Sequence, residues 1–190
     1  MTHIITKSIY TPSNIYNFYT QLSVGELGEQ HAAHDLRPQY KIRRNPYHIN
    51  SFDWYVWVND VRRTIEQKTD TYDMEKTRYM FIERYSDFDR RTNGGIWQAS
   101  DYGADYFLYY FIKNKVYLVF NTQTLLERIN SICSEDQLVP VRNGGYTSMG
   151  YKVERIKVLD ICQIWKFSEK KQCMVHTQHI PYKEQNIIAV

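Results

Sequence analysis

Residues 52–58 and 61–68 alternate between apolar and polar positions on either side of the pair Asn59-Asp60. A period of two is typical of β-strands, and a short polar pair between two such segments predicts a hairpin. If the hairpin turns on two residues, Val58 pairs with Val61, and Asp53 lies opposite Glu66. The apolar face of this ribbon should cover the core, and the other face should carry both carboxylates.

The rest of the chain shows both helical and strand-like patterns. We expect helices over residues 22–36, 101–105 and 122–132, strands over 78–85, 106–112, 116–120 and 151–158, and a loop over 86–99. The sequence has no repeat, low-complexity tract or Gly/Ser linker. It therefore predicts one domain over residues 1–190 of the α/β (α+β) class, with a core over about 22–160 and a C-terminal extension over 161–190.

The opposed pair Asp53 and Glu66 is a candidate metal-binding site. Directly opposed carboxylates have Cβ atoms about 5 Å apart and repel each other. A divalent cation between them would stabilise the pair, and Lys68 follows Glu66 on the same strand face. The alternative is a surface hairpin in which Lys68 neutralises the two acids.

The helix predicted over residues 22–36 carries Glu29 in the middle of its apolar stripe. On a helical wheel the neighbours of Glu29 are Leu22, Gly25, Ala32, Ala33 and Leu36. A buried carboxylate needs a metal or an oppositely charged partner. Glu29 should therefore lie beside the hairpin, either close to a metal or in an ion pair with Lys68 or an arginine.

These segments together resemble the PD-(D/E)XK nuclease superfamily, as found in small nucleases of phages and mobile elements. The resemblance rests on the Glu29 helix GELGEQHAAHDL, the Asp53 strand SFDWYVWV, the motif IEQKTD and the later stretch GIWQASDYGADYFLYYF. It covers about residues 22–120. Phe52 stands where the family's nominal proline would be, and residues 162–190 match no part of the family pattern.

The resemblance implies a restriction-endonuclease-like core, with a central mixed four- to five-stranded sheet flanked by helices. It implies Mg²⁺ or Mn²⁺ held by Asp53, Glu66 and the carbonyl of Gln67. Lys68 would assist the attacking water, and Glu29 would be an auxiliary ligand. The expected activity is hydrolysis of DNA phosphodiester bonds, with Glu29, Asp53, Glu66 and Lys68 as catalytic residues.

The net charge is only +3, so the chain as a whole does not attract a polyanion strongly, and any contact with nucleic acid depends on local clusters of basic residues. Basic residues cluster in the sequence, and clusters of this kind bind phosphate without an extreme overall charge. The predicted nucleic-acid contacts are Lys41, Arg43, Arg44, Arg62, Arg90 and Arg91. Each single cluster has the alternative interpretation of a solvated turn.

Cys133, Cys162 and Cys173 form an odd set without regular spacing, which is typical of free thiols in a reducing compartment. There is no long apolar segment, so we expect a cytoplasmic protein with no membrane association, in the host cytoplasm if a phage encodes it. The expected partners are DNA and, as an option, a second copy of the chain. Two alternatives remain open: a catalytically inactive nucleic-acid-binding or inhibitory protein on the same fold, and a nuclease that acts on RNA.

Overall fold

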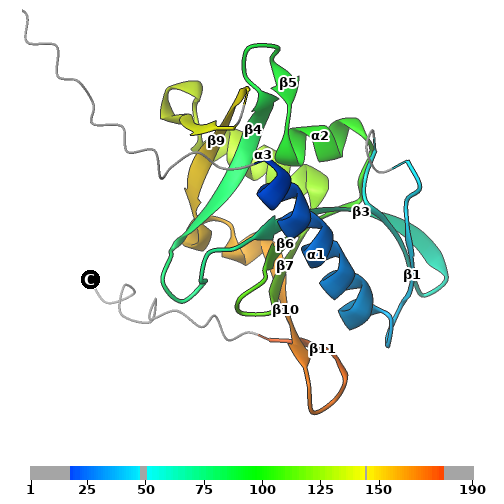
Figure 1. The fold of residues 1–190 in the computed structure, drawn as a ribbon. Helices are drawn as coiled ribbons and strands as arrows, with labels where there is room; N and C mark the ends of the chain where they lie inside the picture. The colour runs from blue at the N-terminus through cyan, green and yellow to red at the C-terminus, as the bar shows by residue number, and fades with distance from the viewer. Residues whose placement is uncertain (1–17, 48–50, 144, 178–190) are drawn as a thin grey trace, which may run out of the picture.

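The computed structural model describes residues 18–47, 51–143 and 145–177. These residues form three α-helices and two β-sheets of a mixed α/β fold, which confirms the predicted fold class (Figure 1). The helices are α1 (Phe18–Leu36), α2 (Gly95–Asp101) and α3 (Thr122–Ile132). The strands are β1 (Lys41–Arg44), β2 (Trp54–Val58), β3 (Val61–Asp70), β4 (Tyr79–Asp87), β5 (Thr92–Asn93), β6 (Tyr106–Phe111), β7 (Val116–Asn121), β8 (Val139–Arg142), β9 (Thr147–Glu154), β10 (Cys162–Ser168) and β11 (Cys173–His176).

The sheets are larger and more numerous than the predicted single sheet of four to five strands. One sheet has seven strands in the order β1-β2-β3-β6-β7-β10-β11, and the other has four in the order β5-β4-β9-β8. The predicted single sheet was wrong because the strand expected over residues 78–85 forms β4, which pairs with β9 in a second sheet. The place beside β3 is taken by β6, which runs parallel to it.

The C-terminal region also belongs to the larger sheet. We expected residues 161–190 to be an extension outside the core, but β10 pairs with β7 over five residues, and β11 pairs with β10. Ile164, Phe167 and Met174 are buried in these two strands. Residues 178–190 lie outside the described part of the chain.

The hairpin forms as its sequence predicts. β2 pairs with β3 in the register from Trp54↔Ile65 to Val58↔Val61, and the turn residues Asn59 and Asp60 have φ values of 49° and 62°. Two residues with positive φ match the right-handed twist of the adjoining strands. Val58 and Val61 are exposed because the hairpin tip extends beyond the core.

The segment between β4 and β6 differs from the expectation. Residues 95–101 form α2, whereas we predicted a loop to residue 99 and a helix over 101–105. Gly94 precedes this helix in an extended conformation, and Gly95 begins it with a φ of 48°. A Cβ at Gly95 would lie 2.6 Å from the carbonyl oxygen of Glu83. The pair Gly94-Gly95 thus allows α2 to start close against β4.

Two hydrophobic cores lie on the two faces of the seven-stranded sheet. On one face, α1 packs through Ala32 and Ala33 against Trp54, Ile65 and Tyr110. On the other face, the four-stranded sheet, α2 and α3 bury apolar residues against β6 and β7. Figure 1 shows α1 (blue) crossing the strands of the larger sheet, with β4 and β9 on the other side of the molecule from β1. β3 therefore runs between two packed layers.

A buried polar group joins these layers at the end of β3. Asp70 is 8% exposed and accepts a hydrogen bond from the Tyr109 hydroxyl, which in turn accepts the N–H of Phe81 on β4 at 3.1 Å. Burial raises the pKa of Tyr109, so the phenol keeps its proton and remains a donor. The contact holds β3, β6 and β4 in a defined arrangement around the polar residues that precede Asp70.

Within the described ranges no helix is long and apolar enough to span a bilayer. The three cysteines at positions 133, 162 and 173 are free thiols, as predicted.

Candidate metal-dependent hydrolytic site

The candidate site lies where the pairing of β2 with β3 ends. The register stops at Trp54, and the preceding residue, Asp53, donates its backbone N–H to the carbonyl of Ile65 at 3.0 Å. The Asp53 carboxylate accepts the backbone N–H of Gln67 at 2.8 Å. Asp53 therefore spans Glu66, with its backbone at Ile65 and its side chain at Gln67. We call Asp53, Glu66, Gln67 and Lys68 the hairpin site.

Asn45 fixes the backbone at Asp53. It is 2% exposed; its N–H donates to the Asp53 carbonyl at 2.7 Å, and its side-chain amide donates to the Phe52 carbonyl at 2.8 Å. The Asn45 side-chain oxygen accepts the N–H of Tyr47 at 3.1 Å. No pattern in the sequence pointed to this residue. Asn45 follows β1, and only the folded structure brings it against Phe52 and Asp53 at the start of the hairpin.

Burial changes the acidity of both carboxylates. Burial, followed by the negative charge of Glu29, raises the pKa of Asp53 to about 7, although the Gln67 hydrogen bond and Arg44 counteract this change. Burial also raises the pKa of Glu66 well above its ordinary range, and the charges of Asp53 and Glu29 add to the effect. Lys68 acts in the opposite direction. Both acids are thus more easily protonated than free carboxyl groups unless a cation lies beside them.

Glu66 has an unsatisfied oxygen. Its Oε2 atom is buried and has no hydrogen-bond partner among the described residues. A buried carboxylate oxygen without a donor is costly, because the polar atom has lost its water without replacement. Oxygen atoms of this kind are suitable ligands for a hard cation.

Glu29 borders the hairpin site but has an ion-pair partner of its own. Its Oε2 lies 2.8 Å from the Arg44 guanidinium, and only 16% of its side chain is exposed. This agrees with the alternative in which an arginine neutralises the buried Glu29. The charge of Glu29 still raises the pKa of Asp53 and Glu66, so α1 does bring Glu29 next to the hairpin.

Gly28 permits this approach of α1. A Cβ at Gly28 would lie 1.9 Å from the Thr69 hydroxyl oxygen, so only glycine fits where the helix meets β3. Thr69 directly follows Lys68 in the strand. Gly28 therefore sets the distance between the helix that carries Glu29 and the strand that carries Glu66.

The predicted nucleic-acid-binding residues separate into three groups. Lys41, Arg43 and Arg62 gather on one face of the β1–β2–β3 ribbon, Arg44 pairs with Glu29, and Arg90 and Arg91 lie between β4 and β5. Arg90 lies 3.6 Å from Asp87, and Arg91 lies 4.0 Å from Glu135. The structure thus brings only the first two groups close to the hairpin site.

Within the described ranges, no group of three or more His, Cys, Asp or Glu side chains is arranged to hold a metal ion. The predicted ligand set consists of two carboxylates, those of Asp53 and Glu66, and the backbone carbonyl of Gln67. Gln67 offers its N–H toward Asp53, and the C=O of a strand residue points to the same side as its N–H. The carbonyl thus lies on the same edge of β3 as Asp53, and carboxylate and carbonyl oxygens are the ligand types that a hard divalent cation prefers.

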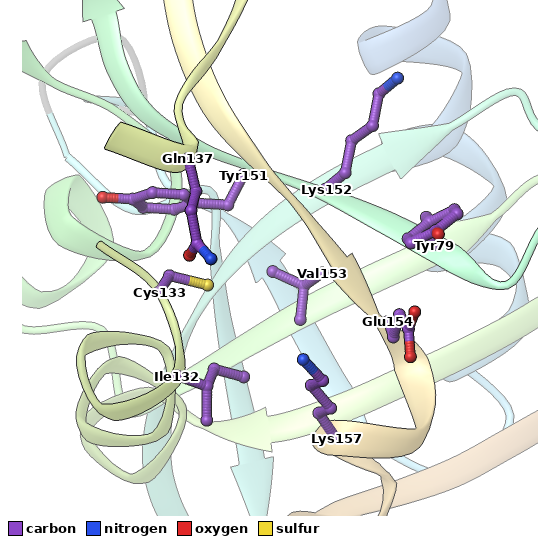
Figure 2. Close-up of a pocket in the computed structure, with 9 residues that line it drawn as sticks. All are labelled: Tyr79, Ile132, Cys133, Gln137, Tyr151, Lys152, Val153, Glu154 and Lys157. Carbon is purple, nitrogen blue, oxygen red and sulfur yellow. The ribbon is translucent and has the colours of Figure 1, made fainter. Parts of the chain in front are cut away.

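Two hollows elsewhere lack this chemistry. A pocket of about 180 Å³ lies between the end of α3 and β9, and Figure 2 shows Cys133, Ile132 and Val153 around it. Burial raises the pKa of the Cys133 thiol, which remains protonated there. A second pocket, of about 400 Å³, lies beside α1 and is lined by His31, Asp35 and Tyr110, among others. None of the predicted site residues lines either pocket.

No family model matches the chain, and no curated protein matches it. Among solved structures, the chain is similar to a bacterial homing endonuclease, I-Ssp6803I, with 14% sequence identity and a TM-score of 0.42. The match covers 56% of this chain and 72% of that chain.

Proposed function

We propose that the chain is a divalent-metal-dependent nuclease that hydrolyses DNA, with a PD-(D/E)XK-type site formed by Asp53, Glu66, Gln67 and Lys68. The observation that carries the proposal is the arrangement of the two acids. Asp53 is hydrogen-bonded across Glu66 to Gln67, and Glu66 keeps a buried oxygen without a donor. In a hairpin with a purely structural role, a buried carboxylate oxygen without a donor would only cost free energy.

The donor atoms support Mg²⁺ or Mn²⁺ as the cofactor. The carboxylates of Asp53 and Glu66 and the carbonyl of Gln67 offer hard oxygen ligands, which both ions prefer. When bound, such an ion supplies positive charge beside the phosphate and activates water for attack. Its positive charge would also counteract the burial and the neighbouring negative charges that raise the pKa of both acids.

Lys68 supplies a positive charge that belongs to the chain itself. It follows Glu66 on the same face of β3 and lowers the pKa of Glu66 through its charge. During hydrolysis a water oxygen forms a bond to phosphorus, and the bond from phosphorus to the leaving oxygen breaks. Negative charge grows on the phosphate oxygens at that point, and a fixed ammonium nearby stabilises it.

Glu29 acts through its neighbours in this proposal. Its ion pair with Arg44 keeps it from serving as a direct ligand in this arrangement. The pair lies beside Asp53, where each member affects the Asp53 carboxyl in the opposite direction. We therefore assign Glu29 a positioning role, in which it holds Arg44 and sets the charge around the two acids.

Incubation with linear and circular duplex DNA in Mg²⁺, Mn²⁺ and EDTA tests the proposal. We expect cleavage with either metal and none in EDTA, and we expect Glu66→Gln to be inactive with both. If the parent leaves DNA intact but cuts RNA, the substrate class is wrong. If it leaves both intact, the chain is a binding or inhibitory protein on this fold.

A further inference from the structure

Cationic and aromatic side chains alternate across the ribbon that leads to the hairpin site. Lys41 lies 4.8 Å from the ring centre of Trp57, and the guanidiniums of Arg43 and Arg62 lie 5.1 Å and 5.2 Å from that of Tyr55. Arg43 comes from β1 and Arg62 from β3, on either side of the strand that carries Tyr55. We call Lys41, Arg43, Arg62, Tyr55 and Trp57 the basic–aromatic patch.

The three cations of this patch have no acidic partner within the described part of the chain. Most arginines elsewhere do: Arg63 pairs with Asp105, and Arg128 pairs with Asp160. Lys41, Arg43 and Arg62 are exposed but rest on rings instead of carboxylates. The patch therefore presents uncompensated positive charge in a restricted geometry.

Protection of a sheet edge does not account for this arrangement. Charged residues on an edge strand discourage pairing with other chains, and β1 is an edge strand. Arg62, however, lies on β3 opposite Trp57 of β2 and not on the edge strand β1, and β6 pairs with β3 only from Ile65 onward. Its guanidinium is directed to Tyr55 in the same way as that of Arg43, so the arrangement belongs to the face of the ribbon.

The patch shares that face with the hairpin site. Arg43 pairs with Tyr55, which pairs with Thr64, and Lys41 pairs with Trp57, which pairs with Arg62. Glu66 is two residues beyond Thr64 on the same face. With about 3.3 Å per residue, the two cationic rows lie about 7 Å and 13 Å from the Glu66 row, or about two to four base-pair steps of duplex DNA.

We infer that the basic–aromatic patch binds the phosphate backbone of duplex DNA beside the bond that is cleaved. This inference rests on the proposed function, which makes DNA the substrate. Cations already lie over the rings of Tyr55 and Trp57, whereas proteins that bind single strands use open ring faces to stack bases. The rings instead orient the cations, and contacts of this kind read phosphates and no base sequence.

The test measures DNA affinity against salt concentration in EDTA, with Glu66→Gln as the background so that no cleavage occurs. The probes are a duplex, the single strand of the same sequence and a duplex RNA. Adding Arg43→Gln and Arg62→Gln should reduce the slope of log K against log salt by about two, since each phosphate contact contributes about 0.9. The charge-matched control is Lys170→Gln with Lys171→Gln, in the turn at the opposite edge of the sheet, and it should leave the slope unchanged.

Tyr55→Leu separates orientation from charge. It leaves the net charge unchanged but removes the ring under two guanidiniums, so the affinity should fall about two- to fivefold while the salt slope stays the same, the scale of an exposed cation–π contact. Tyr55→Phe keeps the ring and should bind as the background does. Equal melting temperatures show that each variant is folded.

Equal losses of slope in the patch and control variants, or tighter binding of single strands or duplex RNA, would overturn the inference. Unchanged DNA binding by the patch variant would also overturn the inference. If the parent protein still cleaves DNA in that case, the proposed function stands. If the patch shows the expected slope but the parent cleaves nothing, the binding surface stands and the nuclease is rejected.

Discussion

The Asp53 carboxylate accepts a hydrogen bond from the backbone N–H of Gln67, the residue between Glu66 and Lys68. Because strand side chains alternate, Glu66 and Lys68 share one face of β3, and Gln67 exposes its backbone toward Asp53. One hydrogen bond thus places the Asp53 carboxylate beside the part of β3 that carries Glu66 and Lys68.

Metal binding should depend on both buried acids. Calorimetry with Mn²⁺ should detect binding to the parent that is lost in Asp53→Ala and in Glu66→Ala, because each variant removes a carboxylate ligand. Glu26→Gln, on the exposed side of the same helix as Glu29, serves as a control and should bind as the parent does. Parent-like binding in both alanine variants would mean that the ion lies elsewhere.

Metal affinity should also increase with pH. The pKa of Asp53 is raised to about 7, so below that value a proton occupies the site and must leave before an ion binds. We expect Mn²⁺ affinity to fall about tenfold for each pH unit below about 7 when one proton is displaced. Calorimetry in buffers of different ionisation enthalpy measures the released proton directly. An Mn²⁺ affinity that stays the same between about pH 5 and about pH 7 would contradict the prediction.

Metal-free stability should decrease as pH rises from about 4 to about 7. In this window the unfolded chain has lost the Asp53 proton while the folded chain keeps it, so the folded state binds more protons. Asp53→Asn keeps an acceptor for the Gln67 N–H and carries no charge. In EDTA it should equal the parent at pH 4 and exceed it at pH 8 by about 2–4 kcal/mol, as measured by denaturant unfolding. A variant less stable than the parent at pH 8 would show that the Asp53 charge is structural.

Lys68→Ala separates an enzyme from a binding protein. If Lys68 acts in the transition state, its loss should lower turnover at least about 100-fold, while DNA affinity in Ca²⁺ stays within several-fold of the parent. Single-turnover cleavage in Mg²⁺ and a binding titration on the same preparation give both quantities. An equal loss in both would place Lys68 in substrate binding instead.

Gly28→Ala should disturb the approach of α1 to β3, because the new Cβ overlaps the Thr69 hydroxyl. We expect a loss of about 1–3 kcal/mol in the free energy of unfolding, the usual cost of overpacking. Gly25→Ala is the matched control in the same helix: its Cβ meets nothing within 4 Å, so it should stabilise the fold by up to about 1 kcal/mol. Similar effects of the two substitutions would refute the close approach at Gly28.

Asn45→Ala tests the support of Asp53. It removes the donor to the Phe52 carbonyl, and we expect a loss of about 1–3 kcal/mol in stability and weaker Mn²⁺ binding. Asn130→Ala, an exposed position on α3, should change neither quantity in this direction. A loss of stability with unchanged Mn²⁺ affinity would limit Asn45 to a structural role.

Local patterns in the sequence determined the elements whose signals are close together in the chain. The β2–β3 register and turn follow from alternation around Asn59-Asp60, and α3 begins and ends at residues 122 and 132, as predicted, because its apolar stripe and flanking residues are local. The same patterns placed Asp53, Glu66 and Lys68 on one ribbon, while the functional roles of these residues and the nuclease family remain predictions.

Only the tertiary structure decided which strands pair over long distances and what surrounds each charge. The parallel pairing of β3 with β6, the transfer of β4 to a second sheet and the inclusion of β10 and β11 depend on packing between distant segments. The Glu29–Arg44 pair and the unpaired Glu66 oxygen are also invisible in the sequence. Desolvation and charge pairing depend on three-dimensional neighbours, whereas side-chain alternation depends only on the chain itself.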